Sequence, residues 1–359
     1  MANFELASGD LLKSDVDAIV NTVNTVGVMG KGIALQFKKA YPANFKAYAK
    51  ACKSGDVELG SMFVFDNGQL TAPRWIINFP TKGHWRSKSK LADIERGLDD
   101  LAETIRERNI RSIALPPLGC GNGGLDWTVV EPLIRERLAD LPATIQIFAP
   151  AGAPAASSMV DATSRPELTP GKAALVAMVD RYTSVALEAS VIEVQKLMYF
   201  LQEAGQPLKL RYEAARYGPY ADNLRHVLIK LEGHHLEGFG DGSRKVKNAE
   251  PIAVLPGAAE EAESAIGLLN DLDLVARMNR TIELAEGFES AYGMELLATV
   301  HWCATRNDGI DDARAAAECV RAWSDRKERL FTDDHVAAAW RQLQDGGWLT
   351  SIGDGVVAQ

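Results

Sequence analysis

Two glycine-rich loops, each between a short apolar run and a helical pattern, constrain the fold of this 359-residue chain most strongly. In the first, residues 18–20 precede three glycines within residues 27–32. In the second, residues 112–115 lead into G-C-G-N-G-G at 119–124. Glycine lets the backbone approach a ligand closely, and a helix N-terminus presents free N–H groups to an anion. Two such strand ends at one edge of a sheet predict a diphosphate site.

The alternative is two unrelated tight turns, since the spacing matches neither G-x-G-x-x-G nor a Walker P-loop. The pairing of the loops favours the site. Around them, strands and helices alternate, which predicts an α/β fold with a mixed or parallel sheet between helices. The expected strands are residues 2–7 (at the edge), 18–20, a hairpin over 57–71 that turns at 66–68, 75–79, 110–115 and 144–148, and the expected helices are 33–39, 44–53, 91–108 and 127–139.

The chain is long enough for two domains. We predict one domain over residues 1–150, a linker over 151–170 that is rich in Ala, Pro and Ser, and a mainly helical domain over 171–359. Its expected helices are 172–182, 190–203, 223–231, 258–275, 282–303, 313–323 and 333–344.

Bulk composition points to a globular protein that stays in the cytosol, because 47% of residues are hydrophobic and neither a membrane span nor a signal peptide is indicated. Cys52, Cys120, Cys303 and Cys319 lack C-x-x-C spacing and are expected to be reduced thiols. Cys120 lies in the second glycine loop, but a small residue filling the turn is favoured over a nucleophile. We expect no metal, because no Cys or acid completes a ligand set around His234 and His235, and no cofactor.

Charge is shared unevenly. Residues 1–150 hold 18 Lys+Arg and 17 Asp+Glu, a balance of +1, and residues 151–359 hold 21 and 31, a balance of −10. An acidic second half would repel nucleic acid and attract a basic partner surface, and an ordinary solvated exterior is the alternative.

Lys82 follows a predicted buried strand and lies near Trp85. Partial burial there would lower the pKa of its amine and make it a nucleophile or an anion ligand, whereas an exposed loop lysine is the alternative. His84 is a possible general base, with a turn histidine as the alternative. The neighbouring W-R-S-K sequence predicts that Trp85, Arg86 and Lys88 contact a nucleic-acid strand and guide it to the site. An exposed polar loop is the alternative.

Residues 1–150 resemble a macrodomain, the ADP-ribose-binding fold. The resemblance rests on G-D-L-L at 9–12, N-T-V-N with G-V-M-G-K-G-I-A over 21–34, and P-P-L-G-C-G-N-G-G-L-D-W at 116–127. N-F-P-T-K at 78–82 resembles the branch that removes ADP-ribose from DNA, the DarG-type antitoxins of toxin–antitoxin pairs.

This resemblance implies that Lys82 is catalytic, that Asp10 binds the adenine amino group and that Asn24 binds the distal ribose. Related glycohydrolases that remove ADP-ribose from proteins place a catalytic Asp where this chain has Gly123. The missing acid favours a leaving group other than the protein carboxylates that those enzymes release. Asp126, three residues on, is expected only to cap a helix. The implied ADP-ribose ligands are Asp10, Leu11, Asn21, Asn24, Gly30, Lys31, Gly32, Ile33, Thr81, Pro117, Gly119, Cys120, Gly121, Asn122, Gly123 and Gly124.

Within the second half, E-V-Q-K-L-M-Y-F at 193–200 and R-Y-E-A-A-R-Y-G-P-Y at 211–220 resemble Panacea-type antitoxin modules. The two resemblances together imply an antitoxin that cleaves ADP-ribose from thymidine in single-stranded DNA. They also imply that it binds a DarT-like toxin through the second half, without contact with a membrane. A non-catalytic ADP-ribose reader and a purely stoichiometric inhibitor are the alternatives.

Overall fold

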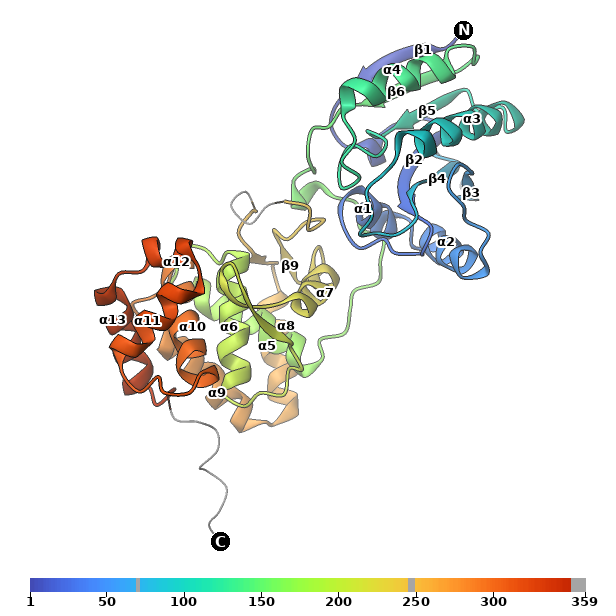
Figure 1. Cartoon of the computed structure of the whole chain (residues 1–359). Coiled ribbons are helices and arrows are strands. Elements are labelled where there is room, and N and C mark those ends of the chain that lie inside the picture. Colours follow the sequence, from blue (N-terminus) through green and yellow to red (C-terminus); the bar gives the residue numbers. More distant parts are fainter. Residues whose placement is uncertain (69–71, 245–248, 350–359) are drawn as a thin grey trace. The chain divides into compact units, whose positions relative to one another are not determined.

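The computed structural model describes residues 1–68, 72–244 and 249–349. The chain forms two compact units. Unit 1 comprises Met1–Ser164 together with Gly240–Arg244, and unit 2 comprises Arg165–Phe239 with the chain after residue 244 (Figure 1). The expected α/β fold of the first half and the mainly helical second half are both confirmed.

Unit 1 is built on a mixed six-stranded sheet with the order β1-β6-β5-β2-β4-β3. All neighbouring strands in it run parallel except the edge strand β3, which is antiparallel to β4. The parallel strands therefore end at one edge of the sheet, where the loops that follow them gather. The strands are β1 (Asn3–Ala7), β2 (Ala18–Asn24), β3 (Phe63–Asp66), β4 (Trp75–Lys82), β5 (Ser112–Leu115) and β6 (Thr144–Phe148).

Helices cover both faces of this sheet, which explains why β2 is apolar on both sides (Figure 1). Val20 of β2 packs in a cluster with α3 and α4, whereas its neighbour Ile19 packs with Phe37 of α1. Close contact with α3 depends on Gly97, where a methyl group would lie 2.3 Å from the Phe79 ring. The helices are α1 (Gly32–Ala40), α2 (Pro42–Ser54), α3 (Leu91–Glu107) and α4 (Trp127–Leu138).

Several expected boundaries in unit 1 are wrong, and two of them bear on the site. β2 continues to Asn24 and β4 to Lys82, because each pairs with the other along its whole length. The expected 57–71 hairpin is instead formed by β3 and β4, since residues 57–62 are not a strand. Part of its predicted second strand, residues 69–71, lies outside the described residues.

Unit 2 is mainly helical, and two of the expected long helices are divided. Residues 258–275 split because Asn270 adopts a left-handed conformation with φ 50° and Asp271 caps a new helix. Residues 282–303 split because the first helix ends at Ala285, Gly287 adopts φ 80°, and Ser290 caps the next helix. The helices are α5 (Pro170–Thr183), α6 (Val191–Glu203), α7 (Asp222–Leu231), α8 (Ala258–Leu269), α9 (Leu272–Ala285), α10 (Ala291–Arg306), α11 (Ala313–Trp323), α12 (Asp325–Leu330) and α13 (Asp333–Asp345).

Two short antiparallel strand pairs, which the sequence pattern did not predict, complete unit 2. They are β7 (Tyr212–Ala215) with β8 (Gly218–Ala221), and β9 (Leu236–Glu237) with β10 (Ala253–Val254). The first pair carries the second Panacea-like motif and packs against α6, which carries the first. The Gln195 side chain bridges them, accepting from the Ala221 N–H at 3.1 Å and donating to the Ala221 carbonyl at 3.1 Å.

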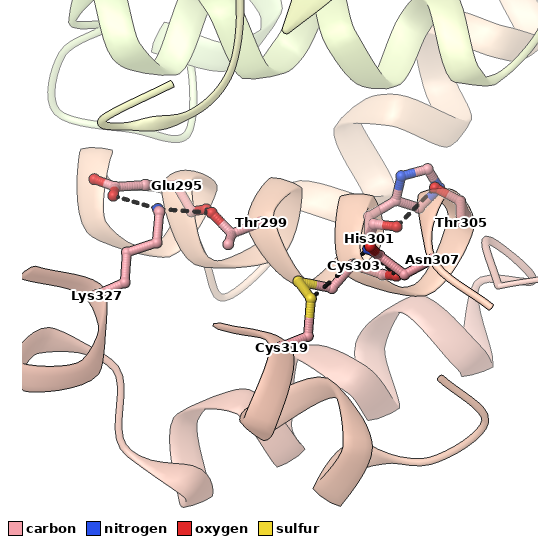
Figure 2. Close-up of a disulfide and its surroundings, with 8 residues drawn as sticks. All are labelled: Glu295, Thr299, His301, Cys303, Thr305, Asn307, Cys319 and Lys327. Atoms are coloured by element: carbon pink, nitrogen blue, oxygen red, sulfur yellow. Dashed lines mark hydrogen bonds and ion pairs between the residues drawn. A yellow bond between two sulfur atoms is a disulfide. The ribbon is translucent and has the colours of Figure 1, made fainter. Parts of the chain in front are cut away.

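The expectation of four reduced thiols is wrong for one pair. Cys303 of α10 and Cys319 of α11 form a disulfide with a Cα separation of 6.1 Å (Figure 2). Their spacing of 16 residues carries no local signature, because only the packing of α10 on α11 brings them together. Cys52 and Cys120 are free thiols.

Within residues 1–68, 72–244 and 249–349, no helix is long and apolar enough to cross a membrane. The same residues contain no group of three or more His, Cys, Asp or Glu side chains arranged to hold a metal ion. His235 is buried and its Nε2 lies 3.3 Å from the Glu261 carboxylate, and burial lowers its pKa.

Candidate active site

Lys82 is the last residue of β4 and lies beside Asn24, its register partner on β2. The sequence predicts Lys82 in a loop beyond the strand. In the structure it belongs to the strand and is held by the sheet. The preceding Thr81 is buried, and its hydroxyl donates to the Val23 carbonyl at 3.3 Å. The strand pair positions the lysine amine at the edge where the glycine loops begin.

The surroundings of Lys82 lower the pKa of its amine. The side chain is half-buried, and burial lowers its pKa; the nearby positive charge of Lys88 lowers it further. Asn24, across the strand pair, is uncharged and does not oppose this effect. A lowered pKa is the direction of change that a lysine nucleophile requires.

The first glycine loop is organised by Asn24, which is 5% exposed. Its Nδ2 donates to the Val28 carbonyl at 2.6 Å, while its Oδ1 accepts from the N–H groups of Val26 and Val28. The hydroxyl of Tyr48 donates to the Asn24 carbonyl at 2.5 Å. The side chain predicted to bind ribose thus holds its own loop in this structure.

That loop ends at the start of α1. Gly30 and Ile33 are half-buried, Lys31 is exposed, and Gly32 is buried with φ 64°, a conformation that glycine adopts without strain. The N–H of Gly32 donates to the main-chain carbonyl of Asp241 at 3.1 Å.

The second glycine loop follows β5 and is packed too tightly at Gly123 for a side chain. A Cβ atom at Gly123 would lie 2.3 Å from the Gly119 carbonyl oxygen and 2.3 Å from Ser89 Oγ. Ser89 holds the loop through its N–H, which donates to the Gly123 carbonyl at 3.1 Å. The position where protein-directed relatives are expected to carry an aspartate therefore has no room for any side chain.

We expect Gly123→Ala to destabilise the free protein by about 1 to 3 kcal/mol, because the added methyl group overpacks the loop against a backbone oxygen. Gly121→Ala is the matched control, since nothing lies within 4 Å of a Cβ atom built there and its φ is ordinary. Thermal unfolding of both variants measures the difference. Equal melting temperatures for the two variants would show that the loop relaxes freely.

The two loops meet. A Cβ atom at Gly32 in the first loop would lie 3.4 Å from Asn122 Nδ2 in the second. At Gly124, a Cβ atom would lie 2.9 Å from Lys88 Nζ, so this predicted nucleic-acid-contact residue lies beside the second loop. The structure thus assembles both loops, Lys82 and a second cation at one edge of the sheet. Half-buried Pro117 begins the turn into the second loop, after β5.

Asp10, Leu11 and Asn21 have local structural partners. The Asp10 carboxylate accepts from the Leu12 N–H at 3.0 Å, and Leu11 is buried. Asn21 is fully buried and donates to Asn78 Oδ1 at 3.0 Å, while its own Oδ1 has no hydrogen-bond partner among the described residues. These positions neither exclude nor require the roles that the resemblance implies.

Cys120 is disfavoured as a nucleophile, and Asp126 caps a helix. Burial raises the pKa of the Cys120 thiol to about 11, with the Asp126 charge as the second cause, which is unfavourable for a thiolate nucleophile. Asp126 caps α4 by accepting from the Thr128 N–H at 2.9 Å, as expected from the sequence.

The basic segment after β4 is partly self-associated. Trp85 is 45% exposed, and the Arg86 guanidinium lies 4.4 Å from the centre of its ring. His84 stacks beside the same ring at 5.2 Å, and its Nδ1 accepts from the Arg86 N–H at 3.2 Å. A nucleic-acid base could stack only on the part of the Trp85 ring that Arg86 and His84 do not cover.

Sequence analysis missed several residues that shape the site. Asn44 and Asn78 form a buried amide pair with Nδ2 to Oδ1 distances of 2.7 and 3.3 Å. Asn78 had been quoted only as part of a motif, and a buried Asn at the centre of a strand is the available signal. The others, Tyr48, Ser89 and Asp241, reach the loops from distant positions and carry no local signature.

Comparison with known proteins shows which family the chain belongs to. Residues 20–134 match the family described as "Macro domain". The DNA ADP-ribosyl glycohydrolase of Thermus aquaticus is 46% identical over 95% of this chain and 93% of its own length. The solved macrodomain of Mycobacterium tuberculosis DarG is 58% identical, with a TM-score of 0.41, over 42% of this chain and 99% of its own.

A fusion protein of Thermosipho africanus, named DNA ADP-ribosyl transferase-DNA ADP-ribosyl glycohydrolase, is 36% identical over 41% of this chain and 42% of its own length. The match to the Thermus aquaticus protein extends through both units, so the relationship is not confined to the macrodomain. The chain belongs to the DarG-type DNA ADP-ribosyl glycohydrolases, enzymes with an N-terminal macrodomain.

Proposed function

We propose that this enzyme releases ADP-ribose from thymidine in single-stranded DNA and also neutralises its cognate transferase toxin by direct binding through the acidic second half. The observation that supports the first part is the position of Lys82. Its half-buried amine, of lowered pKa, lies opposite Asn24 at the edge where two glycine loops meet. A pure ADP-ribose reader would not need this amine.

Cleavage of an N-glycosidic bond develops positive charge at the anomeric carbon of the ribose. The N–H groups of the two loops would hold the diphosphate, and the Lys82 amine would attack that carbon. The carbon–nitrogen bond to thymine breaks, and the base leaves with the bonding electrons and takes a proton from water. Water then hydrolyses the lysine adduct and releases ADP-ribose, which restores the amine.

The test uses two single-stranded oligonucleotides, one ADP-ribosylated on thymidine and one on another base. We expect release of ADP-ribose from the first and little from the second. Equal release from both would remove the thymidine specificity and leave the enzyme class intact.

We expect Lys88→Gln to move the ascending limb of the pH profile of kcat/KM to higher pH. The positive charge of Lys88 lowers the Lys82 pKa, so its removal raises that pKa, and the neutral amine then appears only at higher pH. The kcat/KM profile reports the free enzyme, before the diphosphate neutralises Lys88. Lys88→Arg keeps the charge and should leave the limb in place. An unmoved limb in Lys88→Gln would contradict this electrostatic role.

Toxin binding is supported by the balance of −10 in residues 151–359 and by the transferase–glycohydrolase fusion in a relative. An acidic surface complements the basic groove that a DNA-modifying enzyme needs. Full-length Lys82→Ala tests it, because this variant separates binding from catalysis. We expect it to form a stable complex with the toxin and to block DNA modification at equimolar amounts. No inhibition at a tenfold excess would leave catalysis as the sole mode of protection.

A further inference from the structure

Asp241 lies in unit 1, although the chain on either side of its short segment belongs to unit 2. The segment Gly240–Arg244 packs against α1. Asp241 contacts Gln36 of that helix, although the two are 205 residues apart in sequence. Asp241 is 3% exposed, and its main-chain carbonyl accepts the hydrogen bond from the Gly32 N–H. A distant part of the chain thus occupies the first amide of the helix that follows the first glycine loop.

The Asp241 carboxylate anchors this contact. Its Oδ2 accepts from Gln36 Nε2 at 2.7 Å, and its Oδ1 accepts from the Ser243 N–H at 2.9 Å. Gln36 is itself buried, one turn into α1. A buried carboxylate with both oxygens hydrogen-bonded is a built contact and not a passing one, since an unpaired buried charge is costly.

Further contacts hold the segment and its surroundings. The Arg244 guanidinium donates to the Pro154 carbonyl at 3.2 Å, and a Cβ atom at Gly240 would lie 3.4 Å from Met159 Cε. In the same unit, Lys39 of α1 forms a 2.9 Å ion pair with Asp161, and both side chains are mostly buried. The segment is therefore held at α1 by the main chain and the carboxylate of Asp241, and against residues 154 and 159 by Arg244 and Gly240.

The contact conflicts with the anion site that the proposed function requires. Gly32 has one N–H, and it cannot donate to a phosphate oxygen while it donates to Asp241. The start of α1 attracts negative charge, so the Asp241 carboxylate and a diphosphate would compete for the same place. Because both are negatively charged, they would also repel each other there. Occupation by the segment and full occupation by the diphosphate exclude one another.

We propose that Asp241 sets the affinity for ADP-ribose by holding the segment Gly240–Arg244 on the Gly32 amide, so that the segment must leave before the diphosphate binds fully. This inference rests on the proposed function, because it assigns the Gly32 N–H to the diphosphate. It adds Asp241 and Gln36 to the residues that control the site.

Calorimetric titration of the full-length protein with ADP-ribose tests it. Asp241→Ala removes a hydrogen bond to a charged group, so we expect binding tighter by about tenfold. Gln36→Ala changes no charge and should tighten binding similarly. The double variant should gain little more than either single one, because all three lose the same contact. Asp56→Ala removes an exposed charge from unit 1 and should bind like the wild type.

Hydrogen exchange gives a second readout: in the wild type, ADP-ribose should reduce protection of residues 240–244. Unchanged affinity in both Asp241→Ala and Gln36→Ala, or undiminished protection of the segment in the bound state, would overturn the proposal. Tighter binding in Asp241→Ala alone would also overturn it, since charge and not release would then be the cause. Wild-type protein that does not bind ADP-ribose would instead refute the proposed function, and this inference with it.

Discussion

Lys82→Ala is expected to lower the rate of ADP-ribose release by about a thousandfold or more, because it removes the group that attacks the anomeric carbon. Binding of ADP-ribose should persist, since the two glycine loops hold the diphosphate through main-chain N–H groups. Single-turnover release from a modified oligonucleotide, together with calorimetric binding, measures both properties. Lys90→Ala, a change to an exposed lysine in the same region, is the control and should act like the wild type.

Lys82→Arg separates the two chemical roles that the amine could have. Arginine keeps a positive charge at every accessible pH and cannot act as a nucleophile, whereas it can still stabilise developing negative charge or position an anion. We expect Lys82→Arg to be as inactive as Lys82→Ala. Substantial activity in the arginine variant would show that Lys82 works as a fixed cation. More than a tenth of wild-type activity in Lys82→Ala would remove it from the chemistry altogether.

Glu295→Ala is expected to destabilise unit 2 by about 3 to 5 kcal/mol, because it leaves buried positive charge without a counterion. Glu295 is 2% exposed and accepts from Lys327 Nζ at 2.8 Å and from the Arg326 guanidinium at 2.5 and 3.0 Å. Lys327 is fully buried and also donates to Thr299 at 2.9 Å (Figure 2). Burial lowers the pKa of Lys327 to about 8, with Glu295 opposing the shift.

Thermal unfolding should show this loss as a melting temperature lower by about 10 °C. Glu283→Ala, an exposed glutamate on α9, is the matched control and should change stability by less than about 0.5 kcal/mol. The double variant Glu295→Ala with Lys327→Met removes the orphaned charge and should recover much of the loss. If the double variant is no more stable than Glu295→Ala, the cost comes from lost packing and not from charge.

The sequence by itself determined the α/β character of unit 1, most strands and helices, and the two glycine loops. These features depend on short-range physics: apolar periodicity, glycine conformation and helix capping act within a few residues. The role of Asp126 as a helix cap was predictable for that reason. Ends of paired elements were not, because β2 and β4 extend each other to Asn24 and Lys82 through hydrogen bonds between distant strands.

Tertiary structure alone decided which of these parts form one site. Packing of Ser89 on the second loop leaves no space beside Gly123, and Lys88 lies beside Gly124. Cys303 meets Cys319 only because α10 packs on α11. Asp241 reaches Gly32 across two hundred residues, and no periodicity or motif encodes such a contact. Contacts of this kind depend on where the chain returns in space, which local sequence patterns do not specify.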